Sequence, residues 1–337
     1  MIVADSSSDE NKKLNKEIIS SVSNLDIKYL DNYPTTISPH HKMADAVNNA
    51  EEKYCVLCAD DDFVTPTGIE ESVDFLEKNS DFALAHGQYV AFRLEAGWGK
   101  PRFSWAPIYA RESITFLEPE KRLSYHLSNY SQGTTYAVHR TNILKMAYSE
   151  LLKSKVDPVL FGELLPSMLT VIHGKLKHME VFYAARDSIS SSNPYGPSPR
   201  DFITAGKYEE NYAKFRQCLA AHLSEQSQLD IDASNKVVDE AMTAYMKPYF
   251  AEEVAAHKPM RGVVLDYLHL PGWMDKTIRN VYLELFVKPI SLIREFQVTP
   301  RNITDKPSTD DLPQCGDLGR IRLYILAHLK SVYGRSG

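Results

Sequence analysis

The sequence lacks the features that mark a nucleic-acid-binding, membrane-spanning or exported protein. Its 44 acidic residues outnumber its 38 basic residues, so no basic excess is present to attract nucleic acid. No apolar run approaches the roughly 20 residues that span a bilayer, since the most apolar candidate, from Val281 to Ile293, contains Glu284, Lys288 and Pro289. No charged leader precedes the first apolar run, at 2–4. We therefore expect a cytoplasmic protein without a transmembrane segment.

Cysteine is also scarce, and the four cysteines do not suggest a disulfide framework. Cys55 and Cys58 have a CxxC spacing, but the run from Tyr54 to Cys58 has the pattern of a buried strand. Residues three apart on a strand face opposite sides and lie roughly 10 Å apart. We expect two packed thiols in a reducing compartment, joined neither by a bridge nor by a shared zinc ion.

The first half of the sequence alternates short apolar runs with helical patterns. Apolar spacing predicts helices over about 10–22 and from Pro39 onward, and the segment from Thr67 to Glu70 has capping-box spacing at the start of another helix. Short apolar runs predict strands at 2–4, 27–30, 54–58, 83–92 and 135–138. Strands that alternate with helices indicate βαβ units and a mainly parallel sheet.

Composition divides the chain near residue 190. The stretch from Ser188 to Arg200 contains five serines and three prolines, which is typical of a linker. The pattern beyond it is largely helical. We expect an α/β domain at 1–190 and a mainly helical extension at 191–337.

Acidic residues follow two of the predicted strands: Asp5 after the first, and Asp60, Asp61 and Asp62 after the third. The carboxyl ends of parallel strands are where ligands bind in such sheets. Three adjacent carboxylates repel one another unless a cation or hydrogen-bond donors compensate them. Mg²⁺ or Mn²⁺, held by carboxylates and by substrate phosphates, would do so. The alternative is a solvated turn that caps the next helix.

Several motifs resemble those of known enzymes. The segment from Tyr54 to Pro66 resembles the Asp-x-Asp region of GT-A-type glycosyltransferases. The segment from Ile2 to Asp9 resembles the nucleotide-binding turn of the same superfamily, although Ala4 and Ser6 depart from its usual residues. Over roughly the first 190 residues, the motif order is similar to that of a bacterial, family-2-like glycosyltransferase-domain family. The matching positions are Val3–Ser7, Lys42, Cys58–Phe63, Asp74–Leu76, Gly87–Val90, Tyr136–Arg140 and Phe161–Ser167.

This resemblance implies a GT-A-type, Rossmann-like α/β fold and a hexosyltransferase-like activity. A sugar would move from a nucleotide-diphosphate donor to a saccharide or other hydroxyl acceptor, with inversion and with a divalent cation, Mg²⁺ or Mn²⁺. The implied metal ligands are Asp60, Asp61 and Asp62. The implied donor-binding residues are Asp5, Lys42, Asp60, Asp61 and Arg140.

Glu163 is the implied catalytic base, because it matches the acidic residue that precedes the C-terminal helix of inverting GT-A enzymes. Its apolar neighbours Phe161, Leu164 and Leu165 would raise its pKa. The alternative is an ordinary glutamate near a helix N-terminus, favoured by the macrodipole.

The basic residues that could bind phosphate oxygens also have ordinary structural explanations. Lys42 and Arg140 would each contact phosphate or acceptor oxygens, or would be ordinary surface cations. Arg186 is a weaker diphosphate candidate. His173 and His178 lie where some GT-A enzymes present a metal-ligating histidine, but no motif selects either.

The resemblance also implies that the chain begins at the second strand of the GT-A sheet. An open lane is then expected between residues 2–4 and residues 56–57, about 9.5 Å wide, where paired strands lie about 4.8 Å apart. Direct pairing of these two strands would contradict the topology.

Two other classes of function remain open from the sequence. Sugar-phosphate nucleotidyl transfer uses a related sheet and carboxylates on Mg²⁺. A non-catalytic sugar-binding or scaffold module would need the fold but not the chemistry. The motifs do not identify the donor sugar or the acceptor.

Overall fold

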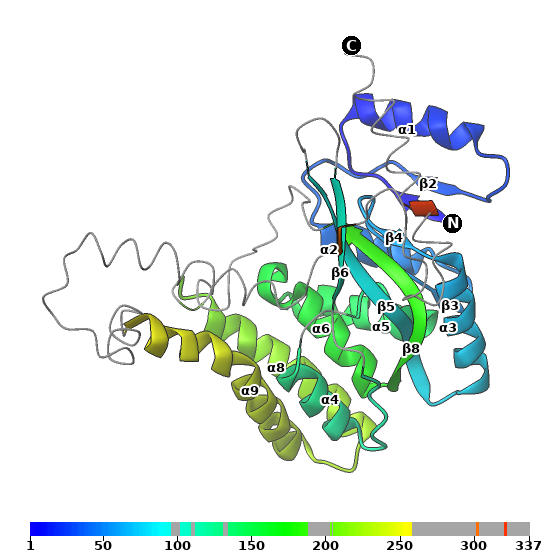
Figure 1. Cartoon of the computed structure of the whole chain (residues 1–337). Coiled ribbons are helices and arrows are strands. Elements are labelled where there is room, and N and C mark those ends of the chain that lie inside the picture. The colour runs from blue at the N-terminus through cyan, green and yellow to red at the C-terminus, as the bar shows by residue number, and fades with distance from the viewer. Residues whose placement is uncertain are drawn as a thin grey trace, which may run out of the picture.

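The computed structural model describes residues 1–95, 102–108, 112–130, 134–187, 203, 205–257, 301–302 and 320–321. They form the predicted α/β fold (Figure 1). The strands are β1 (Ile2–Ala4), β2 (Lys28–Leu30), β3 (Tyr54–Cys55), β4 (Phe63–Val64), β5 (Phe82–Glu95), β6 (Arg102–Ile108), β7 (Val138–Arg140), β8 (Lys175–Asp187) and β9 (Arg301–Asn302). The helices are α1 (Asp9–Ser21), α2 (Pro39–Asn48), α3 (Pro66–Lys78), α4 (Pro119–Ser128), α5 (Thr141–Ser154), α6 (Pro158–Ile172), α8 (Tyr208–Gln226) and α9 (Ile231–His257).

The main sheet is mixed rather than mainly parallel. Its strand order is β3-β7-β5-β6-β9, with β8 beside β5 and β4 beside β8. Of the seven pairings in the described part of the chain, five are antiparallel. The prediction of a mainly parallel sheet is wrong because β4, β6, β7 and β9 all pair antiparallel with their neighbours. The long parallel pair, β5 with β8, forms the centre of the sheet.

Strands β1 and β2 form a separate two-stranded parallel sheet. In the described residues β1 pairs with β2 and not with β3, which confirms that the first and third predicted strands do not pair directly. The width of the lane between them stays a prediction.

Several elements begin at different residues from those expected. Helix α3 is capped by Thr65 rather than by Thr67: the Thr65 hydroxyl accepts a hydrogen bond from the Gly68 N–H and donates one to the Phe182 carbonyl. Pro66 then occupies the first helical position, where its missing N–H costs nothing. Strand β7 begins at Val138, three residues after the predicted start.

The predicted strand from Tyr54 to Cys58 is also shorter than expected. β3 contains two residues, and both are only partly buried. Cys58 is exposed, so the prediction that both thiols are packed is wrong for Cys58. Among the described helices, none combines the length and the apolar character needed to cross a membrane.

The two faces of the sheet carry different helices. Leu84 and Ala85, adjacent on β5, belong to different apolar clusters: Ala85 lies with Leu76 of α3, and Leu84 lies with Val171 of α6. Figure 1 accordingly shows α3 on one flank of the sheet, and α4, α6, α8 and α9 gathered on the other.

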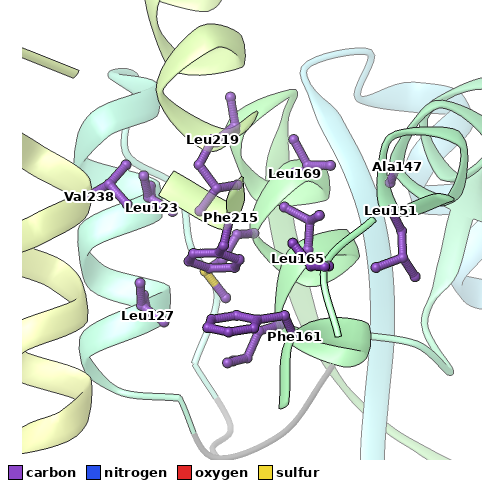
Figure 2. Close-up of a cluster of buried hydrophobic side chains, with 14 of the residues drawn as sticks. Leu123, Leu127, Ala147, Leu151, Phe161, Leu165, Leu169, Phe215, Leu219 and Val238 are labelled. Carbon is purple, nitrogen blue, oxygen red and sulfur yellow. The ribbon is translucent and has the colours of Figure 1, made fainter. Parts of the chain in front are cut away.

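The largest apolar cluster is built by helices from both sides of residue 190. Figure 2 shows side chains that converge from five helices: Leu123 and Leu127 from α4, Ala147 and Leu151 from α5, Phe161, Leu165 and Leu169 from α6, Phe215 and Leu219 from α8, and Val238 from α9. Helices α8 and α9 therefore share their core with the preceding helices. The boundary near residue 190 stays a prediction.

Candidate functional site

Asp5, at the carboxyl end of β1, shapes the loop that follows it. Its side chain is almost fully buried, and its oxygens accept hydrogen bonds from the Ser7 N–H, the Asn15 amide and the Tyr29 hydroxyl. Burial opposes ionisation of this carboxyl, but hydrogen bonds from Ser7, Tyr29 and Asn15 outweigh burial and hold its pKa well below the ordinary range. Asp5 thus ties the loop at Ser7 to Asn15 of α1 and to Tyr29 of β2. Its direct contact with a nucleotide stays a prediction.

The start of helix α2 lies beside this loop. The Lys42 ammonium donates to the Ser6 hydroxyl at 2.9 Å. Ser38 occupies the N-cap position, yet its side chain makes no capping hydrogen bond. The Ser38 hydroxyl and His40 Nδ1 are buried and have no hydrogen-bond partner among the described residues. Buried polar groups normally have partners, and a helix N-terminus attracts anions. The start of α2 is therefore suited to a bound anionic group.

Glu163 lies next to this helix start. A Cβ on Gly162 would lie 2.5 Å from His40 Nε2, so the His40 ring rests directly on the backbone of α6. Glu163 follows on α6 and is exposed. Burial, together with the negative charge of Glu163, raises the pKa of Tyr148, and the Tyr148 hydroxyl contacts Met43 of α2. The structure therefore brings the helix that carries Lys42 close to Glu163 on α6.

The expected apolar surroundings of Glu163 are not found. Phe161, Leu164 and Leu165 are buried in the core, while Glu163 is exposed. Because neighbouring residues on a helix point in different directions, apolar neighbours in sequence do not enclose Glu163. The predicted enclosure of Glu163 by these apolar side chains is therefore not found.

The three aspartates after β3 differ from one another in their surroundings. The Asp62 side chain is only 4% exposed and pairs with the Arg186 guanidinium at 3.0 Å. Its other oxygen accepts the Asp187 N–H at 2.9 Å. Asp60 and Asp61 are exposed. The three carboxylates do not converge on one point, and Asp62 holds Arg186. This arrangement does not favour all three aspartates as ligands of one ion.

Tyr136 and Arg186 hold the loop of Asp60, Asp61 and Asp62 against β8. The Arg186 guanidinium lies 4.7 Å from the centre of the Tyr136 ring, and the Tyr136 hydroxyl accepts the Ala59 N–H. Burial, with the hydrogen bond and charge of Asp62, raises the pKa of Tyr136 well above its ordinary range. Sequence reasoning identified Arg186 only as a weaker diphosphate candidate and Tyr136 only as part of a motif. The signal available in the sequence was the position of Arg186 directly after an apolar strand.

The exposed pair Asp60 and Asp61 suits Mg²⁺ or Mn²⁺. These ions take oxygen ligands and bind through one or two carboxylates together with substrate phosphates. Asp62 does not suit this role, because both of its oxygens are engaged within the protein.

The Arg140 side chain makes its hydrogen bonds within the protein. Its guanidinium donates to the Phe82, Leu76 and Asn79 carbonyls and to the Tyr54 hydroxyl. Arg140 also pairs with Tyr54 at the start of β3, the opposite end from the aspartates. The Arg140 donors hold the end of α3 against the sheet, an arrangement that does not favour the predicted contact with a diphosphate.

A cavity of about 980 Å³ lies elsewhere, between α8 and α9. Its lining includes Tyr208, Tyr212 and Asp239 but none of the predicted site residues.

The fold defines the chain as an α/β protein, and comparisons add a structural likeness. No family model matches it, and no curated protein does. Among solved structures it is similar to residues 1–349 of S. aureus TarS, with 13% identity and a TM-score of 0.44, over 73% of this chain and 62% of that chain. The complex of the same protein with UDP-GlcNAc gives 15% identity and a TM-score of 0.45, over 73% and 63%. This chain therefore spans less than two thirds of the TarS chains to which it is similar.

Proposed function

We propose that this protein is a GT-A-type glycosyltransferase, which moves a sugar from a nucleotide-diphosphate donor to an acceptor hydroxyl with inversion at the anomeric carbon. The observation that carries the proposal is the meeting of three elements: the loop after β1, the start of α2 with Lys42, and α6 with Glu163. A site for an anion and an exposed carboxylate are thereby neighbours.

The donor diphosphate would bind at the start of α2. Lys42 supplies a positive charge, and the helix N-terminus supplies N–H groups and the positive end of its dipole. Burial, with His41 nearby, lowers the pKa of His40 and so favours its neutral ring. A neutral ring with an unpartnered Nδ1 can donate a hydrogen bond to a ligand oxygen without competing with Lys42 for charge.

Asp60 and Asp61 would hold Mg²⁺ or Mn²⁺. When bound, the cation would neutralise the diphosphate as it leaves. Asp62 has a different role, since it fixes Arg186 and the backbone of Asp187 beside the loop that carries the other two aspartates.

Glu163 would take the proton of the acceptor hydroxyl. As that proton leaves, the hydroxyl oxygen forms its bond to the anomeric carbon, and the bond from that carbon to the diphosphate oxygen breaks. The electron pair of that bond departs with the diphosphate. This single displacement inverts the configuration at the anomeric carbon.

Donor binding and donor turnover test the proposal separately. Calorimetry with a panel of nucleotide-diphosphate sugars would detect binding, and release of nucleoside diphosphate would report turnover. We expect Lys42→Ala to weaken donor binding, and Glu163→Gln to reduce turnover by at least about 100-fold with little effect on binding. Lys13→Ala and Glu17→Gln, both exposed on α1, are the matched controls. Unchanged binding by Lys42→Ala together with unchanged turnover by Glu163→Gln would remove the proposal.

A second candidate is a sugar-binding module without catalysis. One observation favours it: Arg186 already neutralises Asp62, so fewer carboxylates face solvent than the motif implied. Stoichiometric donor binding without turnover, on any acceptor tested and with Mg²⁺ or Mn²⁺ present, would support this candidate.

A further inference from the structure

A cluster of potential metal ligands lies away from the proposed donor site. Glu150 of α5 and Cys218 and His222 of α8 each offer one ligand atom, and these three atoms lie within 4.8 Å of one another. In the described part of the chain this is the one group of three such ligands that converges. We propose that Glu150, Cys218 and His222 bind a zinc ion that joins α8 to α5.

The ligand types select zinc over Mg²⁺. Thiolate and imidazole are ligands for zinc, whereas Mg²⁺ takes oxygen. Zinc bonds of about 2.0–2.3 Å in tetrahedral geometry separate the ligand atoms by roughly 3.3–3.8 Å. The cluster therefore needs only small side-chain movements to close on the ion. Cys218 and His222 are four residues apart, so they lie on the same face of α8.

His173 provides a second, independent observation. Its Nε2 lies 3.0 Å from Nδ1 of His222, and Nε2 of His222 lies 3.9 Å from the Glu150 carboxylate. If the His222 Nδ1–H donates to His173, His222 Nε2 is left with a free lone pair on the side of Glu150. This is the tautomer that a zinc ligand requires, and such an outer hydrogen bond is usual for metal-bound histidines.

The Glu150 carboxylate is also held in position. Its Oε1 accepts a hydrogen bond from the Lys153 ammonium at 2.7 Å. The other oxygen, Oε2, remains on the side of His222. With three protein ligands, one tetrahedral position remains for water.

The position of the cluster indicates a structural role. His173 directly follows α6, and Glu163 lies ten residues earlier, which corresponds to about 15 Å along the helix axis. The ligands come from α5 and α8, whose apolar residues already meet in the large core. Zinc would therefore add a coordinate link between two helices that belong to different halves of the sequence.

The test is zinc binding by the full chain. The protein would be stripped with a chelator, dialysed and titrated with Zn²⁺ against a chromophoric competitor. We expect one zinc per chain. His173→Ala should weaken binding by roughly 10–100-fold, as outer-ligand changes do, and Cys218→Ser should weaken it further. Cys58→Ser, which removes an exposed thiol elsewhere, is the matched control and should bind as the unmodified chain does.

Cobalt distinguishes the cluster from other sites even if a variant fails to fold. Equimolar Co²⁺ added to the stripped, unmodified chain should produce a thiolate-to-cobalt absorption band, and Cys58→Ser should retain it. Absence of this band in the unmodified chain, or its loss in Cys58→Ser, would overturn the proposal. So would unchanged zinc affinity in a folded Cys218→Ser, His222→Ala double variant.

Discussion

The contact between His40 and Gly162 can be tested by adding one methyl group. In Gly162→Ala the new Cβ would lie 2.5, 2.6 and 2.8 Å from three atoms of the His40 ring. Overpacking of this kind costs about 1–3 kcal/mol. Alanine in a helix gains about 1 kcal/mol over glycine. We therefore expect a net change in the free energy of unfolding between about zero and 2 kcal/mol of destabilisation.

A double-mutant cycle isolates the contact from the helix propensity. In a His40→Ala background the ring is absent, so Gly162→Ala should stabilise the protein by about 1 kcal/mol. The coupling energy between the two positions is then about 1–3 kcal/mol, measured by urea unfolding of the four proteins. If Gly162→Ala stabilises the unmodified chain and the coupling is near zero, α2 does not rest on α6, and the reason for placing Lys42 near Glu163 is lost.

Three further predictions concern Asp62, Arg140 and Asp5. Asp62→Asn should reduce the free energy of unfolding by about 1–3 kcal/mol, because it leaves Arg186 without its charged partner. Asp60→Asn should change the free energy of unfolding by less than about 0.5 kcal/mol. Equal effects of the two variants in urea unfolding would contradict the pairing of Asp62 with Arg186. Arg140→Met should destabilise by roughly 3 kcal/mol, because it leaves carbonyl groups at the end of α3 unpaired, yet leave donor affinity in calorimetry unchanged. The folded pKa of Asp5 is depressed, so its stabilising contribution is present above the unfolded pKa of about 4 and is lost as the pH falls towards the folded pKa. Asp5→Asn should therefore lose less stability below a pH of about 4 than the unmodified chain does. Identical acid unfolding profiles for the two proteins would refute the argument.

Features that depend on nearby residues were predictable. Helices α1 and α2 begin within one residue of the positions expected from the sequence, since caps, Pro39 and apolar spacing act over a few residues. Even here tertiary contacts intervened at α3. Thr65 was preferred to Thr67 because its hydroxyl also reaches Phe182 on β8, far along the chain.

Features that depend on distant pairing were not predictable. The direction of β7 follows from its long-range pairing with β3 and β5, which periodicity does not encode. The same limit applies to the site. Asp60, Asp61 and Asp62 are identical in type, and the donors that hold Asp62 inward, Arg186 and the Asp187 N–H, come more than a hundred residues later. Likewise the spacing of Cys218 and His222 is visible in the sequence, but the approach of Glu150 is not.

The two proposed metal sites make one further prediction, because a chelator would empty both. The two sets of ligands lie on different elements: Asp60 and Asp61 lie between β3 and β4, whereas Glu150 lies on α5 and Cys218 and His222 lie on α8. The ligands differ as well, oxygen in Asp60 and Asp61 against sulfur and nitrogen in Cys218 and His222. After EDTA treatment and dialysis, we expect Mg²⁺ or Mn²⁺ to restore donor turnover and Zn²⁺ to restore the thermal unfolding temperature. At 100 times its Kd, zinc should add about 2.7 kcal/mol to the free energy of unfolding. Recovery of turnover by one equivalent of zinc alone would refute this division, since the cluster on α5 and α8 would then support the reaction itself.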